Sequence, residues 1–411
     1  MAEYCLIGKK LGHSFSKIIH EKMGYEYDLV ELKEEEVKDF VLSRKYKGFN
    51  VTIPYKKTVM PYLDFIDEEA KAIGSVNTII EKDGKLCGYN TDIYGMEYAF
   101  KYASIEIKDK KVIILGSGGT FETANYLAHK WGAKEVVRIS RSGEDNYENI
   151  SKHYDANIVI NTTPVGMYPN NQDCLIDLKN FKNLEGFFDA IYNPLNTNML
   201  LAAQEILKGT RCSNGLRMLV AQAKKARDLY FNTKMDDNII EKILEGINMS
   251  KINIVLMGMP GSGKSSVGNA LARKMGRPFI DTDEVIIERE GLHTSKIIEQ
   301  KGEAYFRDRE TEVVMEVAKL QGYVIATGGG VVLREENMKA LKQNGIVVFL
   351  DRNILNLSKD GRPLSQGKDA LQKLYKERID LYTKYADITA DSNIPVEGVA
   401  DSIVSDLWGK I

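Results

Sequence analysis

The sequence contains few of the residues that build disulfide frameworks, metal centres or membrane spans. Its 411 residues include only four cysteines and five histidines, and neither set has a paired spacing. Scattered cysteines fit reduced thiols better than a disulfide framework, and scattered histidines form no cluster of metal ligands. No stretch approaches the roughly 18 consecutive apolar residues that cross a membrane. We therefore expect a cytoplasmic protein that has no membrane partner.

The chain also lacks an excess of charge of either sign. Its 56 Lys and Arg residues nearly balance its 58 Asp and Glu residues, and the formal net charge at pH 7 is −2. Proteins that bind nucleic acids or anionic membranes without specificity need a strongly basic surface. The charge balance therefore argues against a nucleic-acid partner. Small anionic ligands remain possible, because they need only local cations.

The length and the hydrophobic pattern predict an α/β protein with more than one domain. A single hydrophobic core stops growing at roughly 250 to 300 residues, which is well below the 411 residues of this chain. Short apolar segments alternate with helical patterns, as is typical of parallel α/β sheets. The predicted strands are residues 112–115, 136–139, 158–160, 252–257, 324–326 and 346–350.

A domain boundary is predicted near the middle of the chain. Residues 238–245 are predicted to form a helix, and a new strand is expected to begin at Lys251, so the joint should lie between Gly246 and Ser250. This gives a first domain over residues 1–248 and a second domain over residues 249–411.

The first domain should divide again into two lobes. We expect a substrate lobe formed by about residues 1–93 and 214–248, and a dinucleotide-binding lobe of the Rossmann type at about residues 94–213.

The first of two glycine-rich loops lies directly after the predicted strand 112–115. A loop of this kind holds a dinucleotide pyrophosphate at the N-terminus of the following helix. The strict GxGxxG pattern would have a small residue where Phe121 stands, so we expect looser packing of helix and strand there. The residues predicted to contact the pyrophosphate are Gly116, Ser117, Gly118 and Gly119.

The segment after the next strand favours NADP over NAD. An NAD site usually has Asp or Glu at the end of this strand, whereas Ser140, Arg141 and Ser142 stand there in this chain. The guanidinium of Arg141 can bind a 2′-phosphate, and the flanking hydroxyls can add hydrogen bonds. The plain alternative for Arg141 is an exposed loop arginine.

The second glycine-rich loop, residues 258–265, reads GMPGSGKS and satisfies the full GxxxxGK[ST] pattern. It follows the predicted strand 252–257 and precedes a helix-like run over residues 266–275. In such a loop Lys264 bridges the β- and γ-phosphates of ATP, and Ser265 is a ligand of Mg²⁺. The remaining predicted nucleotide contacts are Gly258, Gly261, Ser262, Gly263 and Ser266.

Four polar patches precede residue 93, at residues 12–16, 49–57, 75–78 and 88–92. Together they supply the hydroxyls, amides, ammonium and carboxylate that a polyhydroxylated carboxylate substrate requires. Each patch also has a plain explanation. Asn50 and Asn77 could be turn residues, Lys56 and Lys57 could form a solvated face, and Asp92 could be a helix N-cap.

Taken together and in this order, the four patches resemble shikimate dehydrogenase. Three later segments, residues 161–167, 189–197 and 214–223, are also similar to that family. The resemblance implies that Lys56 and Asp92 form the catalytic pair, with Lys56 hydrogen-bonded to the ketone oxygen during hydride transfer. The resemblance further implies substrate contacts by Ser14, Ser16, Thr52, Asn77, Tyr192 and Gln222, and cofactor contacts by Gly215 and Met218.

The segments after the second loop resemble shikimate kinase. They are residues 279–284, 302–310, 326–330, 361–365 and 375–387. The resemblance implies that Asp281 lies near Mg²⁺, that Asp283 contacts the acceptor hydroxyl, and that Arg362 neutralises the transferring phosphoryl group. It also implies an acceptor site in which Arg307 and Arg378 bind the substrate carboxylate and Gly329 supplies a backbone donor.

These kinase-like residues also have plain explanations. Arg307 and Arg309 could pair with Glu303 and Glu310 on a solvated helix, and residues 328–330 could form an ordinary turn. A departure from the family occurs at Ile298, where a phenylalanine is usual, and we expect this to affect substrate affinity.

The sequence therefore predicts two enzymes in one chain. A substrate lobe and a Rossmann NADP lobe would reduce 3-dehydroshikimate with NADPH, and a P-loop kinase-like α/β domain would phosphorylate shikimate with ATP and Mg²⁺. One alternative is an NAD-linked quinate or shikimate dehydrogenase joined to a kinase for another small hydroxy acid. Another is a second domain that acts as a nucleotide-dependent switch, although the chain has no NKxD guanine-binding motif.

Overall fold

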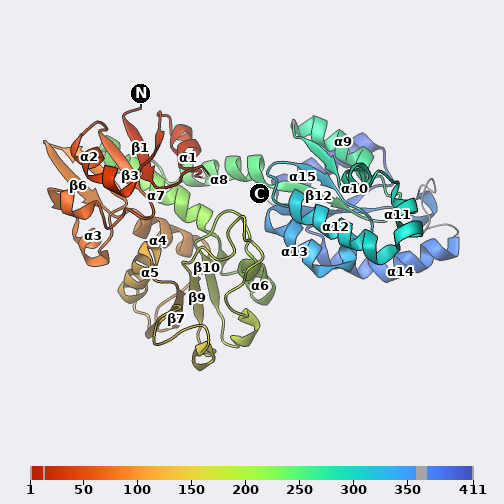
Figure 1. Cartoon of the computed structure of the whole chain (residues 1–411), viewed down its shortest axis with the longest axis horizontal. Coiled ribbons are helices and arrows are strands. Elements are labelled where there is room, and N and C mark those ends of the chain that lie inside the picture. The colour runs from red at the N-terminus through yellow and green to blue at the C-terminus, as the bar shows by residue number, and fades with distance from the viewer. Residues whose placement is uncertain (1, 13, 358–367, 410–411) are drawn as a thin grey trace. The chain divides into compact units, whose positions relative to one another are not determined.

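The computed structural model describes residues 2–12, 14–357 and 368–409. The chain folds into two compact units, residues 1–244 and residues 245–411. Each unit contains parallel β-sheet covered by helices, so the expected α/β class is confirmed (Figure 1). Within the described ranges, no helix is both long and apolar enough to cross a membrane.

The first unit begins with a six-stranded sheet in the order β2-β1-β3-β5-β6-β4. Strand β1 is parallel to β2 and β3, whereas β5 is antiparallel to both β3 and β6. The strands are β1 Tyr4–Gly8, β2 Asp28–Glu31, β3 Gly48–Val51, β4 Phe65–Ile66, β5 Thr78–Lys82 and β6 Lys85–Tyr89. The helices along this sheet are α1 Ser16–Lys22, α2 Val37–Leu42 and α3 Glu68–Ile73.

The second sheet of this unit is entirely parallel, in the order β11-β10-β9-β7-β8. Strand β7 lies between β8 and β9, so the direction of winding reverses beside β7, and ligands of such sheets bind at this reversal. The strands are β7 Lys111–Leu115, β8 Glu135–Ile139, β9 Ile158–Asn161, β10 Gly186–Asp189 and β11 Cys212–Ser213. Helices α5 Gly119–Lys130 and α6 Asn198–Ile206 belong to separate cores that contain alternate residues of β7.

Two long helices connect the sheets of the first unit. Helix α4 (Asp92–Tyr102) leads from the first sheet to the second, and α7 (Gly215–Phe231) follows the second sheet. The two helices approach closely, because a Cβ atom at Gly95 would lie 2.5 Å from the carbonyl oxygen of Met218. This close contact fixes the first residues of α4 relative to α7, and both helix segments carry predicted site residues.

The predicted joint between the domains is helical. Helix α8 runs over Asn238–Lys251, and the next strand begins at Asn253. The predicted helix end at residue 245 was therefore wrong, whereas the strand begins two residues after the expected Lys251. The apolar spacing explains the longer helix, because Ile240, Ile243, Leu244 and Ile247 are all buried at helical intervals that continue past Gly246.

The second unit is one parallel sheet in the order β13-β14-β12-β15-β16. Figure 1 shows α9 on one side of β12, and α12, α13 and α14 on the other. The strands are β12 Asn253–Met257, β13 Phe279–Asp281, β14 Val324–Ala326, β15 Gly345–Asp351 and β16 Ile388–Asp391. The helices are α9 Lys264–Met275, α10 Thr282–Glu290, α11 Thr294–Lys301, α12 Glu303–Val317, α13 Glu335–Gln343, α14 Lys368–Tyr385 and α15 Val396–Trp408.

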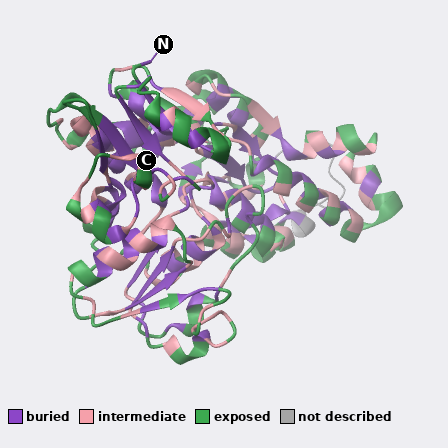
Figure 2. Cartoon of the chain, turned by 60° about the vertical axis from the view of Figure 1, so that its left-hand side comes forward, coloured by how far each residue is buried: buried purple, intermediate pink, exposed green. Residues whose placement is uncertain are grey.

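Alternate side chains of β12 enter the cores on the two faces of this sheet. Val255 and Met257 pack in the core that contains α12 and α13, whereas Ile254 and Leu256 pack in the core that contains α9 and α15. Figure 2 shows the strands largely buried and the exposed residues on the outer helix faces and loops. Short 3₁₀ helices cover Glu34–Glu36, Met60–Tyr62, Ile150–His153, Leu178–Asn180, Val331–Leu333 and Ile354–Asn356.

Candidate active sites

The structure brings Lys56 and Asp92 into direct contact in the first unit. Lys56 lies in the turn after β3, and Asp92 is the first residue of α4. The Lys56 Nζ donates to Asp92 Oδ2 at 2.5 Å, and the two side chains are only 14% and 9% exposed. A Cβ atom on Gly119 would lie 3.6 Å from the Lys56 side chain. The ion pair is therefore adjacent to the dinucleotide loop, as a hydride-transfer site requires.

A buried network of amides and hydroxyls continues from this pair. Asn77 Oδ1 accepts from the backbone amide of Thr91 at 2.7 Å, and Asn77 Nδ2 donates to Gln222 Oε1 at 3.4 Å. Thr91 Oγ1 also lies 3.3 Å from Gln222 Oε1. Behind them, Asn50 Nδ2 donates to Thr78 Oγ1 at 2.9 Å, and this hydroxyl lies 3.1 Å from Asn77 Oδ1. The network fixes the orientation of both predicted substrate amides, of which Asn77 directly precedes β5 and Gln222 lies on α7.

The other predicted substrate residues of this unit come from three separate segments. Ser14 Oγ and Ser16 Oγ lie 3.1 Å apart at the start of α1. The Tyr192 ring lies beside Phe15, with ring centroids 5.3 Å apart, and burial raises the pKa of the Tyr192 hydroxyl. Thr52 is half-buried after β3.

The first glycine loop has the backbone geometry of an anion site. Gly116 has a φ of +114°, and a Cβ atom there would lie 2.7 Å from Thr162 Oγ1, so only glycine fits. Gly118 is the N-cap residue of α5 and provides no side-chain hydrogen bond to the helix. The first amides of α5 are thus available for a phosphate. Phe121 is buried in the core of this unit, and the Arg138 guanidinium lies 5.7 Å from its ring centroid.

The remaining predicted cofactor residues of the first unit lie in two places. Ser140 is buried at the end of β8, and Arg141 and Ser142 are exposed. Gly215 and Met218 begin α7, and a Cβ atom on Gly215 would lie only 2.0 Å from the Ala190 carbonyl oxygen. Glycine at position 215 therefore lets α7 start against the end of β10.

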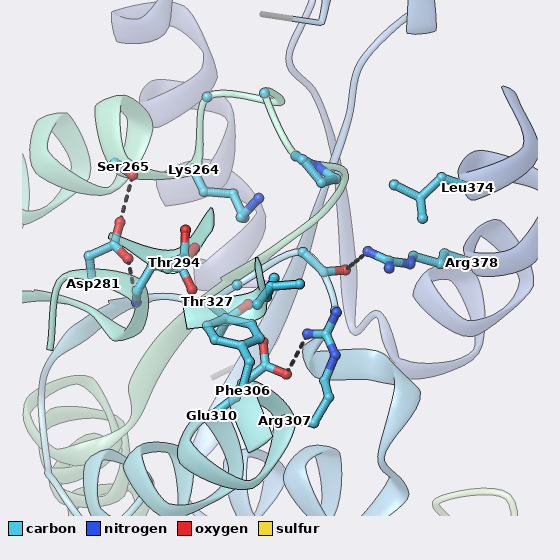
Figure 3. Close-up of a pocket in the computed structure, with 18 of the residues that line it drawn as sticks. Lys264, Ser265, Asp281, Thr294, Phe306, Arg307, Glu310, Thr327, Leu374 and Arg378 are labelled. Carbon is cyan, nitrogen blue, oxygen red and sulfur yellow. Dashed lines mark hydrogen bonds and ion pairs between the residues drawn. The ribbon is translucent and has the colours of Figure 1, made fainter. Parts of the chain in front are cut away.

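The second unit contains a cavity of about 390 Å³ above the carboxyl ends of its strands (Figure 3). Figure 3 shows Lys264 and Ser265 on one side of the cavity, and Arg307 and Glu310 on the other. The predicted residues that line it are Gly261, Gly263, Lys264, Ser265, Ser266, Asp281, Asp283, Arg307, Gly329 and Arg378. Two predicted nucleotide residues, Gly258 and Ser262, do not line the cavity. The Ser262 hydroxyl is buried against Gly258, so these two residues determine the conformation of the loop. Arg362 falls outside the described residues.

The phosphate end of the cavity has oxygen ligands suited to Mg²⁺. Ser265 Oγ donates to Asp281 Oδ2 at 2.6 Å, and Asp281 Oδ1 accepts from the Asp283 amide at 3.0 Å. A hydroxyl and a carboxylate side by side fit the preference of Mg²⁺ for hard oxygen ligands. Lys264 Nζ donates to the carbonyls of Gly258 and Met259, both at 3.0 Å, which holds the ammonium against the loop.

The opposite end of the cavity carries two buried arginines. Arg307 is 8% exposed and donates to Glu310 at 2.8 Å and to Glu303 at 3.1 Å. The sequence alternative of ion pairs with Glu303 and Glu310 is therefore present, but Arg307 lines the cavity and does not lie on a solvated helix face. Arg378 Nη1 donates to the Gly329 carbonyl at 2.9 Å. The Gly329 carbonyl thus orients Arg378, a contact that the sequence did not predict.

Asp283 lies between these two ends. Its Oδ1 atom is buried without a hydrogen-bond partner among the described residues. Burial, together with the negative charges of Asp281 and Glu310, raises the pKa of Asp283 to about 7. A carboxylate of raised pKa inside a cavity can accept a proton from a substrate hydroxyl near neutral pH.

Comparisons with known proteins give matches in both units of the chain. Residues 6–79 match the family model of the shikimate dehydrogenase substrate binding domain, and residues 260–408 match that of shikimate kinase. A shikimate dehydrogenase (NADP(+)) of Clostridium perfringens strain SM101 is 38% identical in an alignment of 267 positions that covers 60% of this chain and 98% of that protein.

Two solved structures have the same fold as the first unit. Shikimate dehydrogenase 1 from Peptoclostridium difficile is 34% identical with a TM-score of 0.55, over 60% of this chain and 97% of that one. A chorismate mutase/shikimate 5-dehydrogenase fusion protein from Clostridium acetobutylicum is 35% identical with a TM-score of 0.56, over 59% and 96%. The chain therefore belongs to the shikimate dehydrogenase family and carries a shikimate kinase domain in the same polypeptide.

Proposed function

We propose that the first unit reduces 3-dehydroshikimate to shikimate with NADPH, and that the second unit phosphorylates shikimate to shikimate 3-phosphate with ATP. One observation carries this proposal: each unit combines a nucleotide loop with a group that can move a proton. In the first unit this group is the Lys56–Asp92 pair beside Gly119. In the second unit it is Asp283, in the cavity that the phosphate loop lines.

In the first reaction, bound NADPH supplies the hydride. The Lys56 ammonium donates a hydrogen bond to the ketone oxygen and stabilises the negative charge that develops there. A proton delivered by the Lys56–Asp92 pair then converts the alkoxide into the hydroxyl of shikimate. The Asp92 carboxylate accepts a hydrogen bond from Lys56 at 2.5 Å and keeps the ammonium in place. Asn77 and Gln222 bind the substrate hydroxyls, while Ser14 and Ser16 bind its carboxylate.

The preference for NADPH is assigned to Arg141. This exposed guanidinium follows β8, where a 2′-phosphate would lie, and no carboxylate stands beside it at residues 140–142 to bind a free ribose hydroxyl. The relative from Clostridium perfringens is named an NADP(+) enzyme, which supports the same choice.

In the second reaction, bound ATP supplies the phosphoryl group and Mg²⁺ neutralises part of its charge. Ser265 and Asp281 would hold the metal, and Lys264 would bind the phosphates. Arg307 and Arg378 bind the carboxylate of shikimate. Asp283 accepts the proton of the attacking hydroxyl, for which its raised pKa suits it. Arg362 is assigned to the transferring phosphoryl group by resemblance alone.

We further propose that these reactions take place in the cytoplasm. All four cysteines are free thiols, which fits a reducing compartment. The ligands proposed are small molecules only, in keeping with the net charge of −2.

The test is an assay of the intact protein with 3-dehydroshikimate, NADPH, ATP and Mg²⁺. We expect loss of NADPH absorbance, followed by formation of a phosphate ester of shikimate. Two further assays test the alternative, an NAD-linked quinate or shikimate dehydrogenase. In the first, NADH replaces NADPH, and in the second the protein is given quinate and NAD in place of 3-dehydroshikimate and NADPH. ATP hydrolysis without ester formation would instead identify the second unit as a nucleotide switch.

A further inference from the structure

Arg352 is a cationic residue of the kinase cavity to which the proposed reaction gives no role. It is the first residue after β15, which pairs in parallel with the phosphate-loop strand β12. Because the carboxyl ends of parallel neighbours meet at one edge of the sheet, Arg352 lies beside the phosphate loop. It lines the same cavity as Gly261, Gly263 and Lys264.

The guanidinium of Arg352 is close to the loop backbone. A Cβ atom on Gly263 would lie 3.4 Å from Arg352 Nη1. Gly263 has a φ of +94° and is the N-cap residue of α9, directly before Lys264. The amides at this turn face the phosphates in loops of this kind, so the Arg352 guanidinium lies next to the anion position.

Arg352 also has hydrogen-bond donors to spare. Its side chain is half-buried, its Nε is buried without a partner, and it has no ion pair with any residue in the described part of the chain. The other cations of the cavity donate to protein groups: Lys264 to two carbonyls, Arg307 to two glutamates, and Arg378 to the Gly329 carbonyl. A partly desolvated cation with unused donors is unfavourable alone and favourable once an anion binds.

We propose that Arg352 binds the phosphate chain of the nucleotide, as a second cation beside Lys264. This inference rests on the proposed kinase function. A guanidinium fork matches two phosphate oxygens, which a lysine cannot reproduce. The shikimate carboxylate is a less suitable partner for Arg352. Its proposed partners, Arg307 and Arg378, come from α12 and α14 at the opposite end of the cavity, whereas Arg352 is adjacent to Gly263 of the phosphate loop. Arg352 thus sets the affinity for a nucleoside di- or triphosphate and leaves that for the acceptor unchanged.

The test measures binding directly in the full chain. A fluorescent ADP with Mg²⁺ is titrated into wild type, Arg352→Ala and Arg352→Lys, and inorganic pyrophosphate is used to displace it. Loss of a charge-assisted hydrogen bond should raise the Kd for ADP in Arg352→Ala by about 10-fold or more. The affinity of Arg352→Ala for pyrophosphate should fall by a similar factor, and Arg352→Lys should recover only part of the affinity for ADP. The Kd of Arg352→Ala for shikimate should stay within about twofold of the wild-type value, a change of only ~0.4 kcal/mol.

Arg273→Ala is the matched control, because Arg273 is an exposed arginine of α9 that pairs with Glu397. It should bind ADP as wild type does, and thermal unfolding should show that each variant is folded. An unchanged Kd for ADP in Arg352→Ala would overturn the inference, and so would weaker binding of shikimate. If Arg352→Ala binds ADP more weakly but binds pyrophosphate as wild type does, Arg352 contacts the base, and this result would also overturn the inference. Failure of the wild type to phosphorylate shikimate while it still binds ADP would count against the proposed function alone.

Discussion

At the residue scale, Asp283 is the group on which the proposed phosphoryl transfer depends most. Its unpartnered Oδ1 lies near the backbone of Gly328, where a Cβ atom would be 2.7 Å away. Asp283→Asn keeps the size of the side chain but cannot accept a proton. We expect the rate of shikimate phosphorylation to fall by about 10² to 10⁴-fold, the usual contribution of a general base. Steady-state kinetics of ester formation would measure this loss.

Nucleotide binding separates this effect from misfolding. Asp281, not Asp283, holds the Ser265 hydroxyl, so the Kd for ADP with Mg²⁺ should not change in Asp283→Asn. The neighbouring Glu284 is exposed, and Glu284→Gln should retain the wild-type rate. An Asp283→Asn enzyme with more than about a tenth of the wild-type rate would exclude the base role, since the smallest usual contribution is about 10²-fold.

A second residue-scale effect concerns stability, and it lies at His20 in the first unit. The His20 ring is fully buried and stacks on Tyr27 with ring centroids 3.9 Å apart, and burial lowers its pKa to about 3. In the unfolded chain this imidazole has its ordinary pKa of about 6.5. The unfolded state therefore binds more protons than the folded state between about pH 6.5 and pH 3, so stability falls as the pH drops through this window.

Replacement of His20 by phenylalanine should remove this pH dependence, because it keeps a ring and cannot be protonated. The urea midpoint of the wild type should drop between about pH 7.5 and about pH 5, and that of His20→Phe should drop less. His129 is exposed, and His129→Gln is the control that should behave as wild type does. Equal pH dependence in wild type and His20→Phe would refute the assignment.

The sequence predicts the residues proposed for both sites and the pairing of Lys56 with Asp92. Most of the other hydrogen-bond partners could not be predicted from it. Lys264 was predicted from the phosphate-loop pattern, and Lys56, Asp92 and Asp283 were predicted from the resemblance of their segments to two enzyme families. The bond from Asn77 to Gln222 joins residues 145 positions apart, so only the tertiary fold reveals it. Arg352 carries no local pattern at all, because its place in the site depends on β15 lying next to β12.

At the scale of elements, the predicted strands coincide with β7, β8, β9, β12, β14 and β15 to within two residues. These strands are short apolar runs buried on both faces, which local pattern detects well. The end of α8 was missed because glycine is only a weak helix breaker. Burial of Ile243 and Ile247 on either side of Gly246 outweighs the cost of about 1 kcal/mol for a helical glycine.

The contact between α4 and α7 gives a prediction about an element pair. In Gly95→Ala the new methyl group would lie 2.5 Å from the Met218 carbonyl, so one helix must shift. We expect a loss of about 1 to 3 kcal/mol in the free energy of unfolding of the first unit. The KM for 3-dehydroshikimate should rise as well, since α7 carries Gln222 and α4 begins at Asp92. Urea unfolding and kinetics of NADPH oxidation measure the two effects.

A second helical glycine serves as the control. In Gly398→Ala, on α15, the methyl group would meet only the Ile394 side chain, at 3.4 Å from Cδ1 and 3.9 Å from Cγ1, which are ordinary contacts. This variant should gain about 0.5 to 1 kcal/mol, because alanine is the better helix former. A Gly95→Ala protein as stable as wild type would show that the two helices are less tightly constrained than the structure indicates.

At the scale of the whole molecule, the residues proposed for the two reactions belong to two separately packed units. Each unit has its own cores, and no residue proposed for one reaction lies in the other unit. Lys56→Ala should therefore abolish reduction and spare phosphorylation, and Lys264→Ala should do the reverse. An equimolar mixture of these two full-length variants then has one working site of each kind per pair of chains, on different molecules.

This mixture tests whether shikimate passes through solvent between the two sites, as we expect. If it does, the lag before shikimate 3-phosphate appears depends only on the concentrations and kinetic constants of the working sites. The mixture, at twice the chain concentration, should then show the same lag as wild type in stopped-flow assays with 3-dehydroshikimate, NADPH and ATP. A shorter lag in the wild type would demonstrate direct transfer of the intermediate. Loss of both activities in either single variant, with folding intact, would contradict the independence of the two units.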